Sequence, residues 1–285
     1  MPNRNRPSAI TEQVKGYYEK NPYPNQRVGN RSDLLREEHR KVMKRILRTA
    51  GLSAKDLRGM RVLDCGCGTG EKAAYCSLMG ADAVGFDISQ KSIDIAEENA
   101  KRLSLSVKYF VSDFKDVNAY LEKKGEEEFD LVLCIGTLHH TDDPFGNFAR
   151  MAKLVRKDGG KVVVGLYSAY GRLGCRVERK FLRLGMGEKK PDEIIKKLGI
   201  AKETDSEVKY ASLADRYASP HETYHSLEEV LGWFAEEGIT PVASSPKTNL
   251  NSHIHMKLSQ VGWLLKNKGF FFVGGEKLSR KRESR

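Results

Sequence analysis

The chain of 285 residues contains 39% hydrophobic and 31% charged residues, which is typical of a globular protein and excludes fibrous and low-complexity classes. No apolar run approaches the ~20 residues that span a bilayer, so we expect no transmembrane segment. No secretory signal is expected either, and five cysteines, an odd number, favour a reducing, cytoplasmic setting over a disulfide framework.

The net charge of +11 is concentrated at the two ends of the chain. Residues 1–50 carry 12 Lys and Arg against 5 Asp and Glu, and residues 251–285 carry 8 against 2, whereas the middle is nearly neutral. A basic surface raises the local concentration of anionic partners. RNA or another acidic partner is therefore one interpretation of these ends, and solvated helices with a frayed tail are the other.

The first 50 residues are polar, and apolar residues recur at helical spacing between residues 34 and 47. An aromatic, proline-containing segment precedes them at residues 17–24. We expect residues 1–50 to form an N-terminal helical cap or lid.

From residue 60 the pattern becomes an alternation of strands and helices. The expected strands are short apolar runs at residues 60–64, 82–86, 107–111, 129–134 and 161–166. The alternation predicts βαβ units in an α/β fold with a mostly parallel, doubly wound sheet, built first by residues 51–168.

Residues 169–225 interrupt this alternation and predict a helical insert after the fifth strand. Its first helix, residues 172–183, combines an apolar face with basic residues, which is typical of contact with an acidic substrate, RNA or a membrane surface, and equally of a solvated helix. A polar group follows as a candidate acceptor pocket or a polar loop: Asp215, Tyr217, His221, Tyr224 and His225.

The core pattern resumes in residues 226–276. Its expected elements are a helix capped by Ser226, strands at residues 238–242 and 269–274, a strand-like alternation at His253 and His255, and then a basic tail at residues 277–285.

Residues 62–71 join a buried strand to a helix through alternate glycines. The strand ends at Asp64, and Cys65, Gly66, Gly68 and Gly70 follow. Glycine lets the backbone approach a ligand closely, and the free N–H groups of the next helix point at it. Because ligands of open α/β sheets bind at the carboxyl ends of the strands, the segment predicts a nucleotide site.

The charge of this segment discriminates between nucleotides. Its spacing is G-x-G-x-G, and only a frame shifted to residues 68–73 matches the dinucleotide fingerprint, loosely. A dianionic pyrophosphate would lie beside Asp64 and Glu71, which is electrostatically unfavourable. A ligand with an ammonium or sulfonium centre suits an acidic site better. We therefore favour S-adenosylmethionine over NAD as the cofactor.

Two more carboxylates end neighbouring strands. Asp87 can accept both ribose hydroxyls, and Asp113 can accept the adenine amine while Phe114 packs on the ring. Each aspartate alone also suits a helix cap or a turn. Three carboxylates at three successive strand ends favour a nucleoside site.

Together these motifs resemble the class I S-adenosylmethionine-dependent methyltransferases over roughly residues 55–168 and 226–275. The resemblance is carried by residues 62–70, Asp87, residues 112–114 and residues 129–140. It implies a Rossmann-like, seven-stranded sheet whose last strand is antiparallel. It also implies that Ile135 and Gly136 line the cofactor and that Tyr17 or Tyr18 belongs to a lid. The candidate cofactor-binding residues are Tyr18, Asp64, Cys65, Gly66, Gly68, Gly70, Asp87, Ile88, Ser112, Asp113, Phe114, Ile135 and Gly136, and no metal site is assigned.

His139 and His140 follow the fourth strand, beside the expected position of the methyl group. Histidine titrates near neutrality, so either ring is a candidate base for a protonated acceptor, and a structural, helix-capping role is the alternative. The Leu-His-His sequence replaces the Asn-Pro-Pro-Tyr or Asp-Pro-Pro-Tyr motif that the family associates with nucleobase and glutamine nitrogens. It resembles the branch that acts on small molecules.

The leading hypothesis is therefore an S-adenosylmethionine-dependent methyltransferase of a small-molecule acceptor. The basic ends and the basic helix at residues 172–183 keep an RNA or protein acceptor as an alternative. A non-catalytic S-adenosylmethionine-binding protein and an NAD-dependent oxidoreductase are further alternatives. The oligomeric state does not follow from the sequence.

Overall fold

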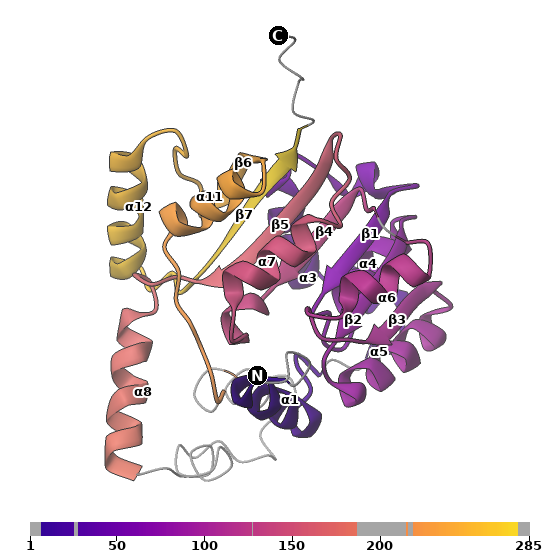
Figure 1. Ribbon diagram of the computed structural model, residues 1–285, viewed down its shortest axis with the longest axis horizontal. Coiled ribbons are helices and arrows are strands. Elements are labelled where there is room, and N and C mark those ends of the chain that lie inside the picture. Colours follow the sequence, from indigo (N-terminus) through magenta and orange to yellow (C-terminus); the bar gives the residue numbers. More distant parts are fainter. Residues whose placement is uncertain (1–6, 26–27, 127, 187–214, 216–218, 279–285) are drawn as a thin grey trace, which may run out of the picture.

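A seven-stranded sheet forms the centre of the computed structural model, which describes residues 7–25, 28–126, 128–186, 215 and 219–278 (Figure 1). The strands lie in the order β3-β2-β1-β4-β5-β7-β6. They are β1 Arg61–Cys65, β2 Asp82–Asp87, β3 Val107–Val111, β4 Leu131–Ile135, β5 Gly160–Tyr167, β6 Ile239–Ser245 and β7 Phe270–Lys277. The first five pair in parallel, and β7 runs antiparallel to both β5 and β6, which confirms the predicted fold class.

Helices cover both faces of this sheet. They are α1 Ala9–Lys20, α2 Arg31–Leu34, α3 Glu37–Thr49, α4 Glu71–Leu78, α5 Gln90–Leu103, α6 Val117–Lys123, α7 Pro144–Ala152, α8 Leu173–Met186, α11 Leu227–Glu236 and α12 His253–Leu265. Side chains alternate along each strand, so Leu63 packs in the core beside α6, α7 and α11, whereas Val62 packs in the core beside α3 and α4. The sheet is therefore buried on both faces, as its near-continuous apolar strands predict.

Residues 1–50 contribute to two different places. The helix α1 lies at the carboxyl ends of the strands and packs beside α5, where the Glu19 carboxylate accepts the N–H groups of Gln90 and Lys91. The helix α3 instead packs on the sheet against β5, β6 and β7. Of the two, only α1 occupies the position expected of a cap over a site (Figure 1).

The C-terminal part contains one difference from the expected elements. Ser226 caps α11 as expected, with its hydroxyl oxygen accepting the N–H of Glu229. The strand expected at His253 and His255 is wrong, because both belong to α12. The hydroxyl oxygen of Ser252 accepts the N–H of His255 and starts that helix.

Strand connections diverge between β1 and β4, because β1 continues through α4 to β2 on one side and β4 continues through α7 to β5 on the other. Such a switch point opens a crevice at the carboxyl ends of the strands. All five cysteines are buried free thiols. No helix in the described part of the chain is long and apolar enough to cross a membrane.

Candidate functional site

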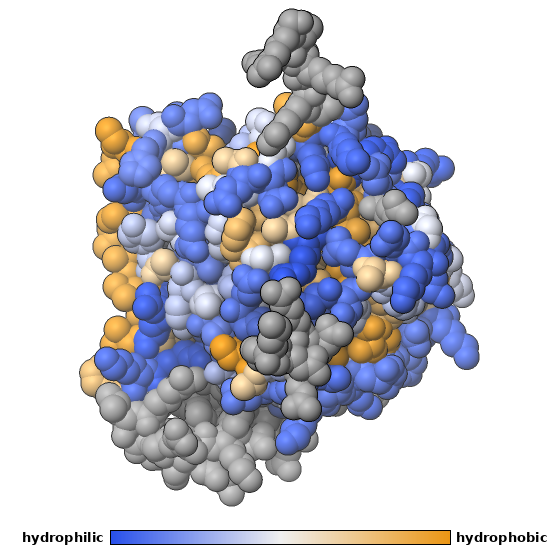
Figure 2. Space-filling model, viewed as in Figure 1, coloured by the Kyte–Doolittle hydropathy of each residue, from blue (hydrophilic) through white to orange (hydrophobic). Residues whose placement is uncertain are grey.

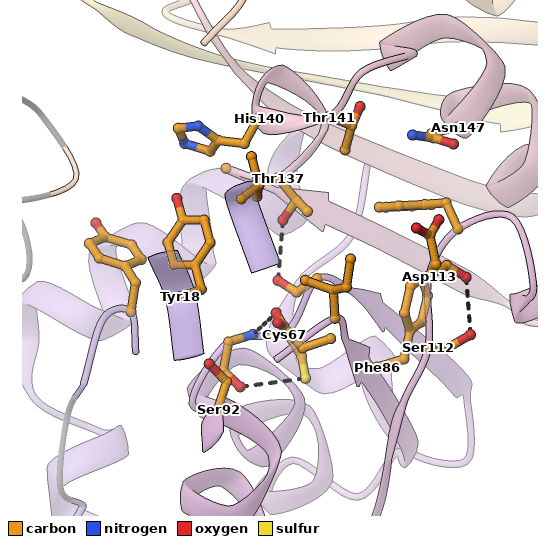
Figure 3. A pocket seen from close by; sticks show the side chains of 18 of the residues that line it. Tyr18, Cys67, Phe86, Ser92, Ser112, Asp113, Thr137, His140, Thr141 and Asn147 are labelled. Atoms are coloured by element: carbon orange, nitrogen blue, oxygen red, sulfur yellow. Dashed lines mark hydrogen bonds between the residues drawn. The ribbon is translucent and has the colours of Figure 1, made fainter. Parts of the chain in front are cut away.

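A pocket lies at the carboxyl ends of β1, β2, β3 and β4 (Figure 3). The helix α1, which lies beyond these strand ends in Figure 1, lines its other side. The space inside it, counted up to and including its open mouth, is about 870 Å³. Its lining is Thr11, Val14, Tyr18, Tyr23, Pro24, Gly66, Cys67, Gly68, Lys72, Phe86, Asp87, Ile88, Ser92, Ser112, Asp113, Phe114, Ile135, Gly136, Thr137, His140, Thr141, Asp142 and Asn147.

Close packing explains the glycines of the loop after β1. Gly66 and Gly68 have φ angles of +67° and +54°, which side chains rarely adopt. A Cβ on Gly66 would lie 2.2 Å from the Thr137 side chain, and one on Gly68 would lie 2.2 Å from the carbonyl oxygen of Tyr23. The loop is therefore held between the end of β4 and the segment after α1, with both glycines on the pocket wall.

The Asp87 carboxylate organises this loop from the end of β2. One oxygen accepts the N–H of Gly68 at 2.9 Å, and the other accepts the N–H of Ser89 at 3.0 Å. Burial raises the pKa of Asp87, and these N–H groups partly offset that effect. Asp87 thus has two roles, because it lines the pocket and also holds the glycine loop in position.

The ends of β3 and β4 complete the opposite side of the pocket. Asp113 follows β3, and its carboxylate accepts the N–H of Lys115. Phe114 packs edge-to-face against Phe86, with ring centroids 5.2 Å apart. At Gly136, after β4, an added Cβ would meet nothing within 4 Å, so open space adjoins the backbone there. This side offers a carboxylate, an aromatic edge and room for a flat ring.

Four sequence-predicted residues lie outside the pocket lining: Asp64, Cys65, Gly70 and His139. Asp64 is fully buried beside Lys72 and the N–H of Ala73. Burial raises its pKa, against the effect of that lysine. Cys65 points to the opposite face of β1, into the core. Gly70, at φ +87°, shapes the loop, and its carbonyl oxygen accepts the Tyr109 hydroxyl.

Lys72 is a pocket residue that the sequence interpretation missed. Burial alone would lower its pKa, but the carboxylates of Asp64 and Glu71 outweigh burial and raise it. The ammonium group therefore stays charged. A lysine in the first turn of α4 opposes the helix dipole, and that unfavourable position was the available sequence signal.

The ring of His140 is held from one side by the insert. Its Nδ1 lies 2.8 Å from the carbonyl oxygen of His221, which assigns the ring proton to Nδ1. The other nitrogen, Nε2, lies 3.6 Å from the Asp215 carboxylate. His140 lines the pocket, so its ring lies between the insert and the cavity.

Asp215 joins three parts of the fold at this point. Its two oxygens accept the hydroxyl of Tyr18 in α1, at 2.8 Å, and the hydroxyl of Tyr167 in β5, at 2.7 Å. Burial and then Asp215 raise the pKa of Tyr18, so its hydroxyl remains a donor. Figure 3 shows Tyr18 and His140 on one side of the pocket and Asp113 on the other. Of the predicted polar group, Asp215 and His221 adjoin the site, and Tyr217 lies outside the described residues.

His139 has a different environment from its neighbour. Its ring packs against that of Tyr167 at an interplanar angle of 31°, with centroids 3.8 Å apart, and neither ring nitrogen has a hydrogen-bond partner within the described residues. Burial lowers its pKa far below the usual value. The single turn of 3-10 helix at Leu138–His140 sends the two adjacent rings in these different directions.

The buried His139 is expected to make folding stability acid-sensitive. The unfolded chain takes up a proton near pH 6.5 that the folded ring refuses, so stability falls with pH below that value. From about pH 7.5 to about pH 5.5 we expect a loss of about 1.4 kcal/mol from this group. Urea unfolding at both pH values measures this loss of unfolding free energy. It should disappear in His139→Phe, whereas His253→Phe, at an exposed histidine, should retain it. His39, whose pKa burial and Lys72 lower to about 4, should leave a residual slope in both variants.

Comparisons with known proteins place this site in a family. Residues 34–243 match the family model described as "Methyltransferase domain". An uncharacterized protein of Synechococcus sp. is 27% identical over 66% of this chain and 49% of its own length. A ubiquinone biosynthesis O-methyltransferase of Rhizobium johnstonii is 39% identical over 38% of this chain and 41% of its own length. The matched region thus spans less than half of these curated relatives.

Solved structures share the fold at low sequence identity. Magnesium protoporphyrin IX methyltransferase from Synechocystis, crystallised with S-adenosylmethionine, aligns over 96% of this chain and all of its own, with a TM-score of 0.55 and 13% identity. PKMT2 from Rickettsia typhi aligns over 83% of this chain and 52% of its own, with a TM-score of 0.58 and 15% identity. The family model matches well over half of this chain. The chain therefore belongs to the family of methyltransferase domains with the class I fold, whose cofactor is S-adenosylmethionine.

Proposed function

We propose that the protein transfers a methyl group from S-adenosylmethionine to a small-molecule acceptor that binds beside His140. The observation that carries the proposal is the position of this ring in the pocket lining, with Nδ1 bonded to the insert and Nε2 3.6 Å from the Asp215 carboxylate. Relatives named for ubiquinone biosynthesis and for magnesium protoporphyrin IX support a small-molecule acceptor. The Leu-His-His sequence supports the same class.

The cofactor-binding roles follow from the two sides of the pocket. Asp87 would accept the ribose hydroxyls, and Ser112, Asp113 and Phe114 would hold the adenine. Tyr18, Ile88, Ile135 and Gly136 would enclose the nucleoside, while Gly66 and Gly68 let the backbone approach it. Lys72 would bind the carboxylate of the methionine part. In this orientation the adenine would lie away from His140, and the methyl group of the cofactor would lie toward it.

Methyl transfer needs alignment above all. Bound S-adenosylmethionine supplies an electrophilic methyl group on a sulfonium, which departs as a neutral thioether when the methyl–sulfur bond breaks. Nε2 of His140 would accept the proton of an acceptor hydroxyl as the new methyl–oxygen bond forms. The Asp215 carboxylate, 3.6 Å away, would stabilise the resulting imidazolium. Tyr18 and Tyr167 keep that carboxylate in place.

The acceptor class can be tested by labelling. Methyl-labelled S-adenosylmethionine is incubated with the protein and with separate small-molecule, RNA and protein fractions. We expect label in the small-molecule fraction, and its loss in a His140→Gln variant. If the label appears only in RNA or only in protein, the acceptor belongs to that class and not to the small molecules. If no fraction is labelled, the result favours a non-catalytic S-adenosylmethionine-binding protein. The basic helix gives RNA less support than its sequence suggests, because Arg172 and Arg179 pair with the buried Glu222.

Lys72 provides a test of cofactor orientation. Replacing Lys72 with methionine should weaken S-adenosylhomocysteine binding by roughly 10- to 100-fold, as expected for a hydrogen bond to a charged group. Adenosine lacks the carboxylate, so its affinity should stay unchanged. Calorimetric titration measures both, with the exposed Lys44→Met as control. Equal losses for both ligands would show that Lys72 acts on loop structure and not on the carboxylate.

A further inference from the structure

One face of α12 exposes a row of large apolar side chains to solvent. Ile254, Leu258, Val261 and Leu265 are 70%, 65%, 46% and 80% exposed. They lie within about 60° of one another around the helix. The opposite face of α12 is the one that packs on the protein, through Met256, Gln260 and Trp263.

The helix α8 also exposes its apolar face to solvent. Leu173, Val177 and Phe181 face outward, and Phe181 is 70% exposed. The inward face carries Cys175 and Arg179, and the Arg179 guanidinium pairs with the buried Glu222. The amphipathic helix predicted at residues 172–183 therefore exists, but its apolar side is turned away from the protein.

These two rows form one surface, which we call the apolar ridge: Ile254, Leu258, Val261 and Leu265 of α12 with Leu173, Val177 and Phe181 of α8. The helices meet end to end, because a Cβ on Gly171 would lie 2.0 Å from the carbonyl oxygen of Lys268. Figure 1 shows α12 and α8 following one another along one edge, and Figure 2 shows hydrophobic side chains gathered along α12 on that edge. Two helices of this length extend over roughly 40 Å.

Cations flank the apolar ridge. Arg176 and Lys180 are exposed beside the α8 row, and Lys257 of α12 and Lys266, the residue that follows this helix, are exposed as well. The sequence of α12 contains no acidic residue, and that of α8 contains Glu178 alone. An apolar face with basic flanks is the pattern of helices that lie in a membrane interface. We propose that the apolar ridge docks this protein on an anionic lipid surface, with the ridge in the interface and the flanking cations at the headgroups.

The same charges disfavour a second copy of the chain as the occupant. A two-fold contact sets the same patch of both copies together, so the cations that flank the ridge of one copy would face the cations of the other. Anionic headgroups instead attract all of them. The α8 end of the ridge is also connected to the residues around His140, because Arg172, just before α8, lies 3.5 Å over the ring of Tyr167, whose hydroxyl bonds to Asp215.

Vesicle co-sedimentation of the full chain tests this. We expect binding to vesicles of phosphatidylcholine mixed with phosphatidylglycerol, weaker binding to phosphatidylcholine alone, and a decrease with added salt. The variant Leu258→Gln/Leu265→Gln should lower the partition coefficient by roughly tenfold or more. Val42→Gln, an equally polar change at an exposed valine of α3, should leave it unchanged. Cofactor affinity reports that each variant is folded, and it should be unaltered.

Two results would overturn the proposal. If the chain binds neither kind of vesicle, and light scattering finds a dimer that Leu258→Gln/Leu265→Gln dissociates, the ridge is a contact between copies. If the chain binds neither kind of vesicle and is a monomer, the ridge docks on no lipid surface. A charge reversal, Lys257→Glu/Lys266→Glu, gives an independent measurement, because it spares the apolar side chains and should still weaken binding to the mixed vesicles.

Discussion

Replacing His140 with glutamine is expected to lower the turnover number by about 10²- to 10⁴-fold, the usual contribution of a positioned general base. Glutamine fills similar space but has no basic nitrogen for the acceptor proton. The dissociation constant of S-adenosylhomocysteine should change little, because His140 lies on the opposite side of the pocket from Asp113 (Figure 3). Steady-state kinetics with the acceptor found by labelling, together with calorimetric titration, measures both quantities.

The control for this variant is a histidine with similar burial outside the pocket lining. His225 is 5% exposed and bonds to Thr223 and Glu229, so His225→Gln should retain turnover. Asp215→Asn should lower the turnover number less than His140→Gln, and the double variant should be no slower than His140→Gln alone, because both changes act on one proton transfer. Full turnover in His140→Gln would mean that the acceptor needs no base from this ring.

The position of the pocket could be predicted from the sequence because parallel strands bring their carboxyl ends to the same edge of the sheet. Asp87 ends β2 and Asp113 follows the neighbouring strand β3, so their arrival in one pocket follows from topology alone. Asp64 is the next-to-last residue of β1, yet its side chain points toward α4. A strand buried on both faces has no polar alternation to show which way a residue points, so this difference could not be read from the sequence.

Long-range partners explain what else the sequence left open. The pattern of α8 predicts an amphipathic helix without showing which face lies inward, and Glu222, far along the chain, pairs with Arg172 and Arg179 on the inward side. The distinct environments of His139 and His140 depend on Tyr167 and on the carbonyl group of His221. Lys72 stays charged only because Asp64 and Glu71 surround it. The first two features are contacts between distant segments, and the third depends on local burial that the sequence does not show.

Replacing Asp87 with alanine is expected to weaken S-adenosylhomocysteine binding by roughly 10- to 100-fold, the effect of losing hydrogen bonds to a charged group. The carboxylate lines the pocket and also accepts the N–H of Gly68, so both a ligand contact and the loop position are lost. Asp87→Asn keeps one acceptor oxygen and should fall between the wild type and alanine. Because burial raises the pKa of Asp87, wild-type affinity should fall as acid protonates this carboxylate, and Asp87→Ala should lack that decrease.

Asp82 provides the matched control for Asp87, because it lies at the other, exposed end of the same strand. Asp82→Ala removes an identical group from β2 without touching the pocket, so its titration should match that of the wild type. Adenosine separates the two effects of Asp87→Ala, since it keeps the ribose but has no methionine part. A loss shared by adenosine and S-adenosylhomocysteine assigns Asp87 to the ribose side, whereas unchanged affinity for both would remove Asp87 from the cofactor site.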